Sequence, residues 1–296
     1  MEEKTLKEWK EIFVIKTNPD KTASIKGIKK YQEVIDIPKK VGEYTVTEIS
    51  EKAFYKLNSK EMYKLKEFSV IIPDTVLTIG ESAFYECKWM KDVKLSNNLK
   101  EISPYSFICT GLKNLVIPDS VKEIGDHAFA QCSHLETVQF SSNLQKIGDE
   151  AFLSCSSIKE LQFPKKLKSI GYYAFGGAEA LQEIVIPDSV KTLKNLAFGY
   201  CRGVRRVVLP KNIKRLPTIF GEISELKELE LPYGLEKIDP GVFSHCYALE
   251  KLFIPATVVE IGIGQFEFAK KVEIYSPAGC YAEQYAKDNN IPWHRC

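Results

Sequence analysis

Phenylalanine recurs along the chain at a nearly constant spacing, and the residues around it repeat with the same period. Ten of the sixteen phenylalanines fall in one register, with gaps of 30, 23, 22, 23, 23, 23, 22, 23 and 23 residues: Phe54, Phe84, Phe107, Phe129, Phe152, Phe175, Phe198, Phe220, Phe243 and Phe266. A second series, an apolar residue followed by proline, runs from Ile37-Pro38 to Ile254-Pro255 and is interrupted at Leu95-Ser96 and Phe140-Ser141. The two series together indicate a tandem array of repeats.

Within one repeat, the apolar positions predict two short extended segments. Leu115 and Ile117 alternate with outward positions, which is the pattern of a strand with one buried face. Pro118 ends this strand because proline cannot donate a hydrogen bond to a ladder. Val121 and Ile124 then predict a second, shorter extended stretch.

The segment around each Ala-Phe pair is interpreted as a single helical turn that ends near the following cysteine. An acidic or serine residue before the pair, as in Asp149-Glu150-Ala151-Phe152, is typical of a helix cap. A unit this small cannot bury its apolar side alone, whereas stacked copies can, at about 4.8 Å per turn of parallel strands. The predicted fold class is therefore a β-rich solenoid of parallel strands and short helical turns.

The repeated unit IPxSVxxIGxxAFxxC closely resembles the BspA-like class of leucine-rich repeats, and the resemblance covers residues 31–274. It implies a leucine-rich-repeat solenoid over 31–274, an N-terminal segment and capping hairpin over 1–30, and a C-terminal helical cap over 275–296. Residues 22–27 match the opening hairpin, and residues 279–287 match the closing helix. The family is known from surface and secreted proteins, so the resemblance implies adhesion to a host or neighbouring-cell protein.

Two features depart from that family pattern. The N-terminal segment MEEKTLKEWK is charged and has no apolar core, so this chain as given carries no secretory signal. No apolar run approaches the ~20 residues that a bilayer crossing needs. Residues 55–66 also lengthen one repeat by seven residues, and we expect a surface bulge there.

Glycine follows the second-strand isoleucine in several repeats, at Gly80, Gly125, Gly148, Gly171 and Gly262. Other repeats carry Ser103, Lys194, Pro217 or Asp239 at this position. Because proline holds φ at about −65°, the position does not require a positive φ in every repeat. We interpret the glycine as a site of close backbone packing rather than as a phosphate-binding loop.

Six of the eight cysteines follow a register phenylalanine by two or three residues: Cys87, Cys109, Cys132, Cys155, Cys201 and Cys246. Ala178 and Ile223 occupy the same slot in other repeats, so the slot is predicted to be buried and apolar, with free thiols. No Cys-x-x-Cys pair occurs, and no metal site is assigned. Cys280 and Cys296 lie outside the series, and a disulfide between them is left open.

The strand faces that point away from the core form the candidate partner-binding surface. Its outward positions alternate between apolar and charged residues, and from Glu183 onward the charges alternate in sign from repeat to repeat. An apolar patch with a charged rim is typical of a protein-binding surface, although ordinary strand formers on an open sheet are the alternative. The candidate residues are Val116, Gln139, Gln162, Val185, Arg206, Val208, Glu228, Glu230 and Phe253.

Composition and charge exclude other classes of partner. Hydrophobic residues make up 44% and charged residues 27%, as in a soluble protein with a core, and the net charge is +2. This balance gives no reason to expect nucleic acid or an anionic membrane as the partner. One repeat carries a basic run, which the next repeat is expected to neutralise: Arg202, Arg205, Arg206, Lys211, Lys214 and Arg215 face Glu222, Glu225, Glu228, Glu230 and Glu236.

No residue pattern predicts catalysis. The histidines, His127, His134, His245 and His294, have no recurring serine, cysteine or acidic partner and are interpreted as solvated loop residues. The carboxylates are scattered, so no acid–base pair, catalytic residue or cofactor is assigned. The sequence favours a non-enzymatic protein-binding module at the cell surface or secreted, with an intracellular interaction scaffold as the alternative. The oligomeric state is not assigned.

Overall fold

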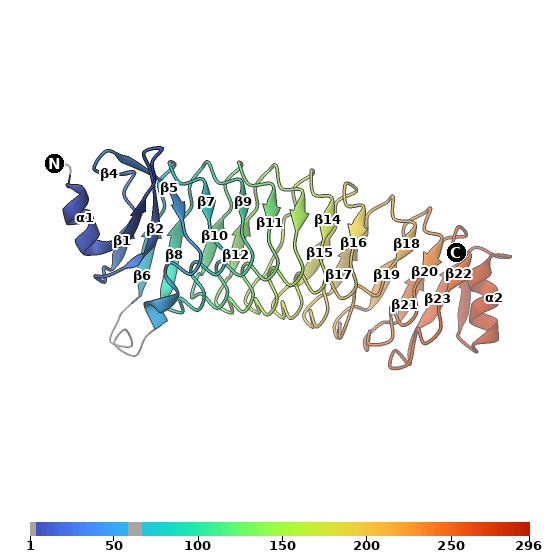
Figure 1. Cartoon of the computed structure of the whole chain (residues 1–296). Coiled ribbons are helices and arrows are strands. Elements are labelled where there is room, and N and C mark those ends of the chain that lie inside the picture. Colours follow the sequence, from blue (N-terminus) through green and yellow to red (C-terminus); the bar gives the residue numbers. More distant parts are fainter. Residues whose placement is uncertain (1–3, 59–66) are drawn as a thin grey trace. The chain divides into compact units, whose positions relative to one another are not determined.

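The computed structural model describes residues 4–58 and 67–296, and the chain divides into two compact units, Met1–Cys155 and Ser156–Cys296. The first unit (Figure 1) contains α1 (Leu6–Ile12), β1 (Phe13–Thr17), β2 (Thr22–Ile28), β3 (Val34–Asp36), β4 (Lys40–Val41), β5 (Tyr44–Ile49), the 3-10 helix η1 (Tyr55–Asn58), β6 (Phe68–Ile71), β7 (Thr78–Ile79), β8 (Met90–Lys94), β9 (Glu101–Ile102), β10 (Asn114–Val116), β11 (Glu123–Ile124), β12 (Thr137–Gln139) and β13 (Lys146–Ile147). The second contains β14 (Ser169–Ile170), β15 (Glu183–Val185), β16 (Thr192–Leu193), β17 (Arg206–Val208), β18 (Arg215–Leu216), β19 (Glu228–Glu230), β20 (Lys237–Ile238), β21 (Lys251–Phe253), β22 (Glu260–Ile261), β23 (Glu273–Ser276), α2 (Tyr281–Asp288) and β24 (Trp293–Arg295).

Most repeats contribute one strand to each of two sets of parallel ladders, as the alternation of apolar residues predicts. In the first unit, β3–β6–β8 and β10–β12 pair on one side of the coil, and β9–β11–β13 pair on the other. In the second unit, β15–β17 and β19–β21–β23–β24 form the first-strand ladders, and β14–β16 and β18–β20–β22 the second-strand ladders. The fold is therefore the predicted parallel-strand leucine-rich-repeat solenoid.

The repeated apolar residues form columns inside the coil. Leu115, Ile117, Val121 and Ile124 are at most 2% exposed, whereas the intervening Val116 is 55% exposed. Nine of the ten register phenylalanines are buried, and Phe266 is half-buried. Neighbouring rings stack, with centroids 5.0 Å apart for Phe84–Phe107, 5.2 Å for Phe107–Phe129 and 5.3 Å for Phe129–Phe152. Each ring thus fills the space between its neighbours, so every repeat supplies the buried surface that the next one needs.

The segments around the Ala-Phe pairs differ from the prediction, because they are successive tight turns rather than helical turns. The residue before alanine has a positive φ, as at His127 (55°), Glu150 (54°) and Tyr173 (48°), whereas a helix cap would be extended. Alternate amides therefore point along the solenoid axis: Phe129 N–H donates to Ala151 O at 2.8 Å in the next repeat. The turns thus act as a third hydrogen-bonded ladder.

The connection between the two strands of a repeat is tied to the next repeat by polar side chains. Where the proline is replaced by serine, the buried Ser141 hydroxyl donates to Val121 O at 2.7 Å, and Ser96 does the same with Val76 O at 2.6 Å. Asp119 accepts a hydrogen bond from Ser142 N–H at 2.8 Å. The interruptions in the apolar-proline series are therefore hydrogen-bonding positions.

The repeated glycines lie where two backbones approach closely, as predicted. A Cβ atom on Gly80 would lie 2.3 Å from Glu51 N, and one on Gly262 would lie 2.4 Å from Pro240 N. Neither glycine has a positive φ. The glycine therefore serves packing between turns.

Both ends of the chain carry the secondary structure expected of caps. β1 and β2 form an antiparallel hairpin, and β2 also pairs with β5. The sequence pattern did not predict α1, which has a capping box between Thr5 and Glu8. α2 buries Ala282 and Ala286, and β24 extends the ladder beyond β23. Residues 59–66 of the predicted bulge lie outside the described residues.

Candidate functional site

In the first unit, the outward strand face carries Val116 and Gln139 side by side. β10 and β12 pair in parallel with Val116 opposite Gln139 and Leu115 opposite Val138. Both candidate residues are exposed. The residues two positions earlier are joined by a hydrogen bond of 2.7 Å from Thr137 Oγ1 to Asn114 Oδ1. This part of the face therefore carries one apolar side chain among side-chain amide and hydroxyl groups.

In the second unit, β15 and β17 bring Val185 and Val208 together. The two valines are register partners; Val185 is 40% exposed and Val208 is half-buried. Glu183 and Arg206 are partners in the same pair of strands and form an ion pair. At these two repeats, the charges that were predicted to alternate in sign thus form a cross-strand ion pair, Glu183–Arg206, beside the two valines.

Further along the second unit, β21, β23 and β24 form an aromatic stack, of which the sequence pattern indicated Phe253 but not the other two rings. Phe253 lies opposite Glu230 and stacks on Tyr275, with ring centroids 4.8 Å apart, and Tyr275 stacks on His294 at 4.8 Å. A hydrogen bond of 3.0 Å to Glu273 raises the pKa of Tyr275. The alternation in Glu273-Ile274-Tyr275 repeats that of Lys251-Leu252-Phe253, and this signal would have extended the face.

The predicted face of the second unit is not one continuous ladder. β17 and β19 belong to different sheets, so Val208 and Glu230 are not ladder partners. Gln162 is exposed but lies outside any assigned strand, in contrast to the expectation. Nearby Phe163 stands where later repeats carry Ile186 or Leu209, and its ring packs edge-on against Phe175 at 5.4 Å.

The basic run of the second unit is neutralised largely as predicted. Three pairs join it to the next repeat: Arg202–Glu222 at 2.7 Å, Arg205–Glu225 at 3.8 Å and Lys214–Glu236 at 2.7 Å. Two residues pair differently, since Arg206 pairs with Glu183 of the preceding repeat and Arg215 pairs with Asp239 at 2.6 Å. The hydrogen bond to Asp239 raises the pKa of Arg215.

Five of the six cysteines in the series are buried as predicted and Cys109 is half-buried, and all six thiols are free. Cys155 Sγ lies 3.2 Å from Phe129 O, and Cys201 Sγ lies 3.3 Å from Phe175 O, so each S–H donates to the carbonyl of the preceding register phenylalanine. Burial raises the pKa of Cys201 and Cys246 to about 12, which keeps these thiols protonated and unreactive at neutral pH. Cys280 and Cys296 are also free, so the disulfide left open is not formed in this structure.

The histidines are structural rather than uniformly solvated. His127 is half-buried, stacks on Tyr105 at 4.7 Å and lies 3.0 Å from a Glu150 carboxylate oxygen. His245 is also half-buried, and its ring lies 4.9 Å from that of Phe268. Of the four, only His134 is the exposed loop residue that was expected.

The described residues form neither a cluster of metal ligands nor a membrane-spanning helix. Across residues 4–58 and 67–296, no three His, Cys, Asp or Glu side chains are grouped closely enough to hold a metal ion. In the same residues, no helix has both the length and the apolar character needed to cross a membrane.

Comparison with known proteins supports the repeat assignment. The model of the BspA type leucine rich repeat region matches residues 47–178 and 146–273. Among solved structures, a leucine-rich cell surface protein of Faecalibacterium prausnitzii is 22% identical (92% of this chain and 94% of that chain covered, TM-score 0.41). A leucine-rich repeat protein of T. pallidum is 20% identical (96% of each chain covered, TM-score 0.45). No curated protein matches this chain. Because the family model spans most of the sequence, the chain belongs to the BspA-type leucine-rich repeat family.

Proposed function

We propose that this chain is a non-enzymatic protein-binding module that acts in adhesion at the cell surface or after secretion. The observation that carries the proposal is the outward strand face of the second unit, where Val185, Val208 and Phe253 lie among charged residues. An apolar centre with a charged rim is the anatomy of a protein-binding surface. A repeat array also presents one such position per turn, which suits a macromolecule better than a small substrate.

The location of the module rests on its relatives. The Faecalibacterium prausnitzii structure is of a cell surface protein, and we extend that location to this chain. An intracellular interaction scaffold is the second candidate, and the free, exposed thiol of Cys296 favours it, because exposed thiols tend to pair in oxidising compartments. Fractionation of the native cells, with immunodetection of the chain, separates the two locations.

A variant on the outward face tests the binding role. Wild-type chain and the double variant Val185→Asp/Phe253→Asp are used to capture proteins from the native cell surface, and the captured proteins are quantified by mass spectrometry. The double variant is expected to retain less than about a tenth of the captured partner, because each carboxylate would be desolvated in an apolar contact.

Val259→Asp is the matched control, since Val259 is 65% exposed and lies directly before β22, in the other strand ladder. It should retain the partner. Equal capture by the double variant and the wild type, with both folded by circular dichroism, would place partner binding elsewhere.

A further inference from the structure

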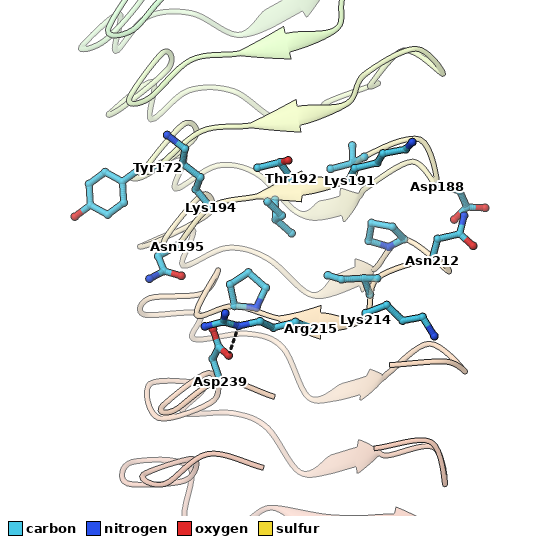
Figure 2. Close-up of a pocket in the computed structure, with 15 residues that line it drawn as sticks. Tyr172, Asp188, Lys191, Thr192, Lys194, Asn195, Asn212, Lys214, Arg215 and Asp239 are labelled. Atoms are coloured by element: carbon cyan, nitrogen blue, oxygen red, sulfur yellow. Dashed lines mark hydrogen bonds and ion pairs between the residues drawn. The ribbon is translucent and has the colours of Figure 1, made fainter. Parts of the chain in front are cut away.

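The second unit contains an open groove of about 840 Å³ between the second strands of two neighbouring repeats. Its walls are β16 and β18. Figure 2 shows Thr192 on β16 with Lys191 directly before it, Arg215 on β18 with Lys214 directly before it, and Asp239 paired with Arg215. The groove lies on the second-strand ladder and uses none of the residues of the outward first-strand face.

The groove coincides with a break in this ladder. β14 and β16 pair in one sheet and β18, β20 and β22 pair in another, so β16 and β18 are not ladder partners. Elsewhere in the unit, the residue after each second strand donates its N–H to the preceding repeat, as in Lys194 N to Ile170 O at 3.1 Å and Asp239 N to Leu216 O at 3.0 Å. The corresponding residue of β18 is Pro217, which has no N–H to offer to Leu193 O.

The sequence explains why the two strands separate here. Four residues lead from Leu216 to the register Phe220, whereas five lead from Leu193 to Phe198, yet the two phenylalanines remain bridged. The shorter connection must draw β18 away from its usual position. The packing glycine is also absent from three successive repeats, which carry Lys194, Pro217 and Asp239. The absence of glycine does not open the ladder by itself, because Lys194 N–H and Asp239 N–H still donate to the preceding repeat.

The break uncovers part of the apolar core. Leu193 and Ile213 belong to buried columns but are half-buried, and both line the groove. Their counterparts in the other repeats of this unit are buried. Ile170, Leu216 and Ile238 in the column of Leu193, and Leu167, Leu235 and Val258 in that of Ile213, are 0% exposed, and Ile261 and Val190 are 8% and 5% exposed. The floor of the groove is therefore apolar, whereas the core is covered elsewhere along this ladder.

The rim of the groove is predominantly basic. Lys191, Lys194, Lys214 and Arg215 line it, against Asp188 and Asp239. Asp239 is largely buried and already paired with Arg215, and Asp188 accepts the backbone N–H of Lys211 at 2.8 Å. The Lys214–Glu236 pair is exposed, and such pairs are worth ~0–1 kcal/mol, so an incoming carboxylate can replace it.

We propose that this groove binds an extended acidic polypeptide segment of a partner protein, in a mode that adds a strand beside β16. Acidic side chains of the segment would pair with Lys191, Lys194 and Lys214, and alternate apolar side chains would cover Leu193 and Ile213. The backbone N–H of the segment would supply the donor that Pro217 lacks. A peptide fits better than a sulfated polysaccharide, because a polysaccharide offers neither the alternating apolar side chains nor the backbone amides. The groove extends the proposed protein-binding role to a second surface.

Fluorescence anisotropy with the full chain tests this site. The probes are a labelled ten-residue peptide of alternating Asp and Val, the same peptide with Lys in place of Asp, and the acidic peptide N-methylated at alternate residues. The acidic peptide is expected to bind, and the other two are expected to bind at least about tenfold more weakly. Equal binding of the N-methylated peptide, or displacement by a heparin fragment as effective as by unlabelled peptide, would indicate a polyanion site and overturn the proposal.

Two variants locate the binding. Lys191→Glu/Lys194→Glu should weaken the acidic peptide by about tenfold or more, whereas Lys100→Glu/Lys122→Glu, exposed lysines in the first unit, should not. Pro217→Gly with one serine inserted after it restores the five-residue spacing and the missing N–H while keeping every charge of the rim. This variant should lose the peptide, and full binding by it would contradict the ladder break as the site.

The two proposals fail separately. Val185→Asp/Phe253→Asp alters the first-strand face and should leave peptide binding unchanged. If the acidic peptide does not bind while this variant still loses captured protein, the groove proposal is wrong and the proposed function stands. If the peptide binds but captured protein is unaffected by the variant, the outward face is wrong and the groove stands.

Discussion

At the scale of single residues, the cysteine slot combines two requirements. The slot is small and buried, which alanine also satisfies, as Ala178 shows. Cysteine adds a weak donor aimed at a carbonyl of the preceding repeat, as in the contacts of Cys132 with Phe107 O at 3.2 Å and of Cys87 with Phe54 O at 3.6 Å. That carbonyl lies in the turn ladder. This second role explains why cysteine, rather than any small apolar residue, recurs at the position.

The raised pKa of Cys201 predicts a pH dependence of stability. Its thiol has a pKa of about 12 in the folded protein against an ordinary value of 9.0, so unfolding releases a proton between these pH values. The contribution to stability is complete below pH 9 and declines as pH rises toward 12, by up to ~1.4 kcal/mol per pH unit. Urea unfolding of Cys201→Ala at pH 7.5, 9 and 10.5 should show a shallower decline than the wild type.

Cys296→Ala is the control for that measurement, because Cys296 is exposed and its removal should leave the pH slope unchanged. Cys201→Ala also removes a buried sulfur, which should cost ~1 kcal/mol at neutral pH through loss of packing. Identical slopes for Cys201→Ala and the wild type would show that the Cys201 thiol does not titrate with unfolding.

At the scale of elements, the turn between the two strands of a repeat depends on particular hydroxyl groups. Ser141→Ala should lower the free energy of unfolding by ~1–2 kcal/mol, because it removes the donor to Val121 O and the acceptor for Asn143 N–H, 3.1 Å away. Ser120→Ala, in the preceding turn, is the matched control. The buried Ser120 hydroxyl has no hydrogen-bond partner among the described residues, so its removal should be neutral or stabilising. Urea unfolding curves of the two variants that coincide would contradict this assignment.

The strands and the turns of a repeat differ in how well they could be predicted from the sequence. The two strands of a repeat were predictable because Leu115, Ile117 and Ile124 occupy buried columns in which each residue type recurs. The turns around the Ala-Phe pairs were not predictable in this way. Alternate residues such as His127 take a left-handed conformation, which is stabilised by hydrogen bonds between repeats. A single repeat does not contain those bonds.

The same limit applies to the candidate surfaces. The outward positions of Val116 and Val185 follow from alternation alone, and both side chains are exposed. The groove depends on two features that act together: the shortened connection after Leu216 and the missing amide of Pro217. Each is visible in the sequence as a small irregularity, but its consequence appears only when two neighbouring turns are placed side by side.

At the scale of the whole molecule, a solenoid is stable in solution only if its terminal strands are covered. The first unit begins with α1 and an antiparallel hairpin, and the second ends with α2 and β24. β24 pairs with β23, placing Trp293 opposite Ile274 and His294 opposite Tyr275, and Ile274 is 0% exposed. Without this cover, β23 would present unpaired backbone groups and apolar side chains to other chains.

Removal of residues 277–296 should therefore make the chain self-associate. The truncated chain is expected to remain folded by circular dichroism but to form dimers or larger species that increase with protein concentration, measured by size-exclusion chromatography with light scattering. Tyr275→Lys in the truncated chain should reduce this association, because a lysine on an edge strand opposes pairing with another edge. A truncated chain that stays monomeric over the concentrations at which the full chain does would mean that the exposed edge of β23 does not pair. In that case α2 and β24 would contribute through packing on Ile274 alone. The truncation would then lower the free energy of unfolding but leave the chain monomeric.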